Sequence, residues 1–140
     1  MTLLNLKAST KDIDFNFETN DDLKEFKKAE SKIIHGYEID IYSNGCIFTQ
    51  QLPQDYVNKA ILIKQKFDNV KLYAIHPVDI VATKIGRLNE RDFEDIHDCI
   101  NKFGLAKQQV KKRGKQIIYA GNEDNYSYNL QDVLKKMFKK

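Results

Sequence analysis

Residue types and segments typical of secreted or membrane proteins are scarce in this chain. It has only two cysteines, Cys46 and Cys99, far apart in the sequence, so it has no framework of disulfides and fits a reducing cytoplasm. No stretch approaches the roughly 18 apolar residues that a membrane helix needs. Residues Met1–Lys7 lack the layout of a signal peptide. We therefore expect a cytoplasmic protein with no membrane partner.

Repeats, low-complexity tracts and linkers are also missing, so the 140 residues predict a single domain. The three histidines, His35, His76 and His97, show no metal-ligand spacing. Strand patterns dominate residues 1–75 and helical patterns dominate residues 76–140, which predicts an α+β fold.

The expected elements follow from apolar periodicity and from turn or cap residues. The sequence predicts strands over residues 3–18, 33–43 and 46–50, and a hairpin over 61–67 and 70–75. It predicts helices over residues 20–31, with Asn20 as candidate cap, and over 77–88, 89–104, 105–113 and 130–138.

Charge is unevenly distributed along the chain. From Lys102 onward ten lysine and arginine residues face three acidic residues, a net charge of +7, whereas the rest of the chain carries −4. A solvated helix surface explains this basic end, but it could also steer a polyanion toward an acidic metal site.

Three aspartates stand in apolar, alternating stretches. Asp12 and Asp14 are two residues apart, so they project from the same face of a strand, and Asp40 lies between Ile39 and Ile41 in a second stretch. If the two strands are neighbours, the carboxylates converge and repel one another unless a cation neutralises them. Such hard oxygen ligands suit Mg²⁺ or Mn²⁺.

A second group of charged residues lies in the helical half. Lys84 and Arg87 are three residues apart and share a helix face, from which both can reach a phosphate. Asp92 and Asp95 lie in the first turns of the helix that Asn89 begins, where acids stabilise the helix dipole or pair with the cations. The sequence favours a phosphate contact for Lys84 and structural pairing for the two acids.

Together these blocks resemble the nucleotidyltransferase superfamily, and most of all its minimal AbiEii-type toxins and their uncharacterised relatives. The resemblance spans roughly residues 7–100, and the order of the blocks is more specific than any one of them. The blocks that carry it are Thr10-Lys11-Asp12-Ile13-Asp14, Glu38-Ile39-Asp40, Pro77-Val78-Asp79-Ile80-Val81-Ala82-Thr83-Lys84 and the segment from Arg87 through Arg91-Asp92 to Asp95-Ile96.

The resemblance implies a mixed β-sheet with flanking helices and a C-terminal helical part. It implies that Asp12, Asp14 and Asp40 bind divalent metal and act in catalysis, and that Lys84 and Arg87 lie near the nucleotide. One feature departs from the family pattern: the Gly-Ser or Gly-Gly element that precedes the first aspartates is absent here, because none of the eleven residues before Asp12 is glycine.

The resulting expectation is a metal-dependent transfer of a nucleotide from a nucleoside triphosphate to a hydroxyl of RNA or protein. The chain could be the toxin of a toxin–antitoxin pair, with RNA or an antitoxin as partner, and it could self-associate through Leu3, Leu4 and Leu6. Two alternatives stay open. One is a non-catalytic binding protein of the same fold that has lost the phosphate-binding loop, and the other is a metal-dependent nuclease that uses the same carboxylates.

Overall fold

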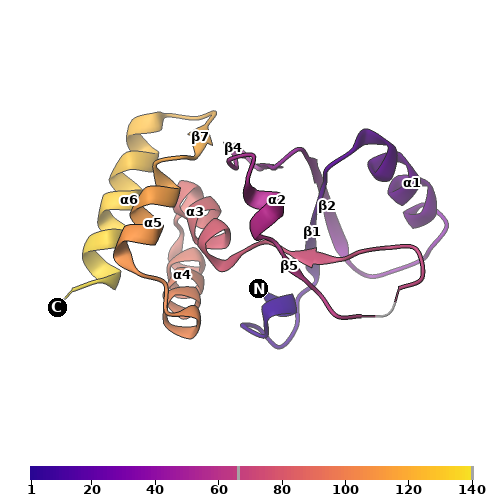
Figure 1. Ribbon diagram of the computed structural model, residues 1–140, viewed down its shortest axis with the longest axis horizontal. Coiled ribbons are helices and arrows are strands. Elements are labelled where there is room, and N and C mark those ends of the chain that lie inside the picture. Colours follow the sequence, from indigo (N-terminus) through magenta and orange to yellow (C-terminus); the bar gives the residue numbers. More distant parts are fainter. Residues whose placement is uncertain (66, 140) are drawn as a thin grey trace.

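The computed structural model describes residues 1–65 and 67–139, and its two halves are built differently (Figure 1). Strands and one long helix make up the N-terminal half, and four helices gather in the C-terminal half, which confirms the α+β class. Lys66, in the predicted hairpin, and Lys140, at the basic end, lie outside the described residues.

The strands form three small sheets, one parallel and two antiparallel. The parallel sheet contains β1 (Asp12–Phe17) and β2 (Glu38–Ser43), which α1 (Asn20–Glu30) connects. The antiparallel sheets contain β3 (Cys46–Ile47), β4 (Gln50–Gln51) and β7 (Ile118–Tyr119) in one case and β5 (Ile61–Leu62) and β6 (Tyr73–Ala74) in the other.

The β1–α1–β2 unit is held together by aromatic side chains. Phe15 and Phe17 of β1 contact Phe26 of α1, with ring centroids 4.8 and 5.0 Å apart. The cap of α1 is Thr19, whose side chain accepts a hydrogen bond from the first turn, and Asn20 is already helical. Every residue of β1, α1 and β2 is at least partly exposed, so this unit contributes little to the buried core.

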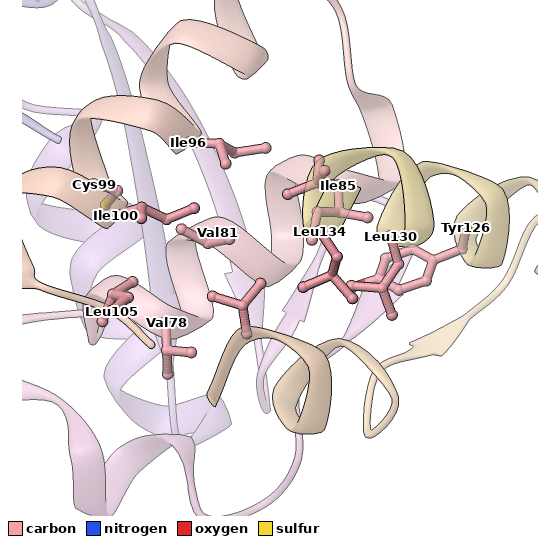
Figure 2. Packing of buried hydrophobic residues seen from close by; sticks show 12 residues of the cluster. Val78, Val81, Ile85, Ile96, Cys99, Ile100, Leu105, Tyr126, Leu130 and Leu134 are labelled. Carbon is pink, nitrogen blue, oxygen red and sulfur yellow. The ribbon is translucent and has the colours of Figure 1, made fainter. Parts of the chain in front are cut away.

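The helical half contains the core of the molecule. Val81, Ile85, Ile96 and Cys99 are fully buried where the helices face one another (Figure 2). Val133 of the last helix is fully buried in the same cluster. The last helix is longer than its apolar pattern predicted, because Asn122 caps it ahead of residue 130. The helices are α2 (Tyr56–Lys59), α3 (Pro77–Arg87), α4 (Glu90–Phe103), α5 (Lys107–Gly114) and α6 (Glu123–Met137), and a short 3₁₀ turn, η1, spans Thr2–Leu4.

The boundaries of α3 and α4 follow from cap residues visible in the sequence. His76 caps α3 through its side chain, with Pro77 at the first helical position, where its missing N–H costs nothing. Asn89 caps α4, and Gly104 ends it with φ 59°. The two helices are therefore joined by Leu88 and Asn89 alone, which brings the end of α3 against the first turns of α4.

None of the helices in residues 1–65 and 67–139 combines the length and the apolar character that a membrane span requires.

Candidate functional site

Asp14 and Asp40 lie directly opposite each other on the parallel sheet. The register pairs Asp14 with Asp40 and Asp12 with Glu38, and residues two apart share a face, so all three predicted aspartates project from one face. All three are exposed. The convergence of the aspartates required the two strands to be neighbours, and they are. The helix α1 connects β1 to β2 and so allows them to pair in parallel.

The electrostatics of this face centre on Asp14. Burial and the nearby Asp40 carboxylate raise the pKa of Asp14, while the charges of Arg87 and Lys84 lower it and Asp12 raises it slightly. Asp14 therefore lies within electrostatic range of both the other acids and the cations at the end of α3. Like charges directly opposite on neighbouring strands destabilise a sheet, so a cation at this position is favoured.

The close cluster of three ligands expected from the sequence is not formed. Among residues 1–65 and 67–139, no group of three or more His, Cys, Asp or Glu side chains is placed to hold a metal ion. Asp14 and Asp40 come together, whereas Asp12 lies two residues before Asp14, opposite Glu38. The donor chemistry still fits Mg²⁺ or Mn²⁺, because opposed carboxylates are the ligands these ions prefer.

Lys84 and Arg87 are held by acids of α4. The Lys84 ammonium lies 3.1 Å from Asp92 and 2.7 Å from Asp95, measured from Nζ to a carboxylate oxygen. Arg87 donates from Nε and Nη2 to the two oxygens of Asp92, each at 2.7 Å. Both acids are buried, so the structural pairing predicted for them is present, and Lys84 belongs to the same network.

The network sets the ionisation of its acids. Burial alone would raise the pKa of Asp92, but the hydrogen bonds from Arg87 and Lys84 outweigh it and hold the pKa at about 2. Burial also raises the pKa of Asp95, but the hydrogen bonds from Lys7 and Lys84 outweigh it, and the net effect is a lowered pKa. Three cations, Lys7, Lys84 and Arg87, thus pair with the two buried carboxylates of Asp92 and Asp95. This network therefore has a net charge of +1 beside the acidic sheet.

Sequence patterns did not predict two contributors to this region. Lys7 binds Asp95 at 2.8 Å across 88 residues, a contact that no local pattern signals. Phe48 lies under the Arg87 guanidinium, whose carbon is 5.1 Å from the ring centroid, and contacts Tyr42 at 5.4 Å. The sequence predicted one strand over residues 46–50. In the structure this segment is a hairpin that turns at Phe48, and the residues on either side form the two short strands β3 and β4.

A separate ion-pair cluster lies deeper in the helical half. Arg113 of α5 bonds the fully buried Asp79 of α3 and reaches Asp55 just before α2. These contacts join three elements that are distant in the sequence. Arg113 and Asp79 are buried, whereas the Asp55 side chain is 47% exposed. Because two of the three partners are buried, we assign these contacts to the stability of the fold.

The chain was compared with known families and proteins. The sequence model of the family described as "Nucleotidyltransferase of unknown function (DUF6036)" matches residues 2–138. No curated protein and no solved structure matches the chain. The family match agrees with the order of acidic and basic blocks, but it does not extend to the AbiEii-type toxins. The match covers nearly the whole chain, and the chain accordingly belongs to the nucleotidyltransferase family DUF6036.

Proposed function

We propose that the protein transfers a nucleotide from a nucleoside triphosphate to an acceptor hydroxyl, with Asp14 and Asp40 as the principal metal ligands. The observation that carries the proposal is the Asp14–Asp40 pair, opposed on parallel strands and within electrostatic range of Arg87 and Lys84. A site with carboxylates on one side and guanidinium and ammonium groups on the other matches a metal–triphosphate complex, which offers both signs of charge.

Each residue has a distinct role in this proposal. Asp14, Asp40 and Asp12 would hold Mg²⁺ or Mn²⁺, which when bound neutralises phosphate charge and lowers the pKa of a bound hydroxyl. Asp40 accepts the proton of the attacking hydroxyl. Arg87 uses Nε and Nη2 for Asp92, which leaves Nη1 to donate to a phosphate oxygen.

Lys84 contributes differently from Arg87. Its side chain is 16% exposed and its ammonium already contacts two carboxylates, so its phosphate contact is electrostatic more than direct. For the acceptor we propose RNA, because the positively charged end of the chain attracts polyanions. A toxin role with an antitoxin partner belongs to the same proposal.

The test is nucleotide transfer with matched acidic variants. The purified protein is incubated with Mg²⁺ or Mn²⁺, each labelled nucleoside triphosphate and total RNA, and label on the RNA is measured. Asp14→Asn and Asp40→Asn should abolish both transfer and Mn²⁺ binding. Asp21→Asn, on the solvent side of α1 with its side chain 94% exposed, should change neither.

A non-catalytic binding protein is the second candidate, because no described group of three side chains is placed to hold a metal ion. It predicts that nucleotide or RNA binds equally well to the wild type and to Asp14→Asn, without transfer by either. RNA cleavage without added nucleotide would instead identify a nuclease.

A further inference from the structure

The hairpin between β3 and β4 carries an unusual residue at its tip. Ile47 pairs with Gln50, so Phe48 and Thr49 form a two-residue turn, and Phe48 has φ 53°. Positions with positive φ in such turns favour glycine, asparagine or aspartate, because a larger side chain is crowded by its own backbone. Phenylalanine is therefore a costly choice here, and its side chain must offset that cost.

Burial of the Phe48 side chain does not offset the cost of its backbone conformation. The neighbouring Ile47 is 7% exposed and belongs to a small core cluster, whereas Phe48 is 46% exposed. Its ring forms an edge-to-face pair with Tyr42 and a cation–π contact with the guanidinium of Arg87. A bulky apolar ring thus stands partly in solvent on a strained backbone, a combination that is typical of functional sites.

The ring lies beside the candidate site. Tyr42 follows Asp40 by two residues on β2, so both side chains share a face. Burial raises the pKa of Tyr42, and the nearby carboxylates of Asp40 and Asp14 raise it further. Arg87 contacts the ring of Phe48, and its positive charge also lowers the pKa of Asp14. Arg87 therefore links Phe48 to the acidic face. This corner lies at the carboxyl ends of two parallel strands, where open α/β sheets bind ligands.

We propose that Phe48, braced by Tyr42, is the surface on which the nucleobase of the nucleoside triphosphate stacks. The inference rests on the proposed function and adds a base-binding residue to it. Flat aromatic rings stack on every base through their π-faces, so this contact gives affinity without strong base preference. Arg87 then joins the two ends of the ligand, with phosphate at its free amino group and the base on the adjacent ring.

The experiment separates base binding from phosphate binding. Binding of Mg–ATP and of Mg–tripolyphosphate, which has no base, is measured by calorimetry for the wild type and for Phe48→Gly. Glycine suits a positive φ, so this variant should fold at least as stably. We expect it to bind ATP about 5- to 150-fold more weakly, the range for loss of one stacked base, and to bind tripolyphosphate as the wild type does.

Two further variants complete the test. The chain has no tryptophan, so Phe48→Trp provides a single fluorescent reporter whose emission ATP should quench and tripolyphosphate should not. Tyr128→Ala removes an aromatic ring that is 69% exposed on α6, away from the site, and should leave both affinities unchanged.

Three outcomes would overturn the inference, and they are distinguishable. Equal ATP affinity of the wild type and Phe48→Gly removes the stacking role and leaves the proposed function intact. Parallel loss of ATP binding, tripolyphosphate binding and stability shows that Phe48 only supports Arg87. Failure of the wild type to bind either ligand removes both the inference and the proposed function.

Discussion

At the scale of single residues, Lys84 lies between two buried acids of α4. It neutralises part of the charge of Asp92 and Asp95, which are 1% and 8% exposed. Removing one partner of a buried pair leaves a charge that neither water nor protein fully compensates. Because Arg87 and Lys7 still bind these acids, the loss should stay below that for an isolated buried pair.

Lys84→Ala should lower the free energy of unfolding by about 1–3 kcal/mol, the cost of leaving a buried polar group poorly satisfied. Urea denaturation at pH 7 measures it. Lys24→Ala, which removes a lysine that is 76% exposed on α1, is the matched control and should have little effect. Unchanged stability of Lys84→Ala would mean that its ammonium is free to bind phosphate.

The pKa of Asp92 makes the network sensitive to acid. Its ordinary value of 3.8 is lowered to about 2 in the fold, so the carboxylate stabilises the folded state above pH 4 and this stabilisation is lost as pH falls toward 2. At pH 7 it amounts to about 2 kcal/mol. The difference in unfolding free energy between the wild type and Asp92→Asn should therefore be largest near neutral pH and shrink below pH 4. A difference that is constant with pH would contradict the ion-pair origin.

At the scale of elements, α3 and β4 meet where a side chain larger than glycine does not fit. A Cβ at Gly86 would lie 1.9 Å from the side-chain nitrogen of Gln50, which is itself 2% exposed. Alanine usually stabilises a helix relative to glycine, but here the neighbouring strand blocks it.

Gly86→Ala should therefore destabilise the protein by about 1–3 kcal/mol, as overpacking does. In the double variant with Gln50→Ala the added methyl has room, so the second substitution should recover part of the loss. Thermal and urea unfolding of the wild type, the two single variants and the double variant gives the coupling energy between Gly86 and Gln50. Additive effects would show that Gly86 and Gln50 do not clash.

When no metal is bound, Arg87 and Lys84 compensate the like-charge pair of the β1–β2 sheet only in part, since the pKa of Asp14 stays raised. Asp14→Asn removes one of two facing charges, so the metal-free variant should gain about 0.2–1 kcal/mol at pH 7. The folded-state pKa of Asp14 is raised, so this gain disappears as pH falls through that pKa and both proteins carry a neutral side chain. Saturating Mn²⁺ should reverse the order by stabilising the wild type alone. A wild type that Mn²⁺ leaves unchanged would argue against the site.

At the scale of the whole molecule, the two halves differ in how much they bury. The core lies among α3–α6. Within residues 1–65 and 67–139, β1 and β2 pair only with each other and so present open edges. Met1 and Leu6 pack partly against the helical core, so only Leu3 of the nearby apolar residues is strongly exposed, at 50%. Ile34, between α1 and β2, is fully exposed.

Open edges and exposed apolar side chains predict self-association through the N-terminal half. Sedimentation equilibrium between about 1 and 100 µM should show a concentration-dependent rise in mass, and Leu3→Lys or Ile34→Lys should reduce it. Ile118→Lys, at a similarly exposed position on β7, is the control. A protein that is monomeric throughout this range would contradict the prediction.

Much of the fold and part of the site follow from local sequence. Pro77, Asn89 and Gly104 mark helix ends because caps act through bonds to residues a few positions away. The alternation around Asp14 and Asp40 predicts which face they share, since side chains alternate along any strand. The acidic face and the paired acids of α4 were therefore predictable, as was the α+β class.

The remaining features depend on tertiary structure. The contact of Lys7 with Asp95 joins residues 88 apart, and the stacking of Arg87 on Phe48 joins two halves of the chain. The short strand β7 pairs with β4, which lies far from it in the sequence. Such contacts form when the packed core closes long loops, and their energies depend on partners that no local pattern specifies. The sequence by itself therefore determined the ends of α3 and α4 and the acidic face, whereas the tertiary structure alone decided which cations and which aromatic ring lie beside that face.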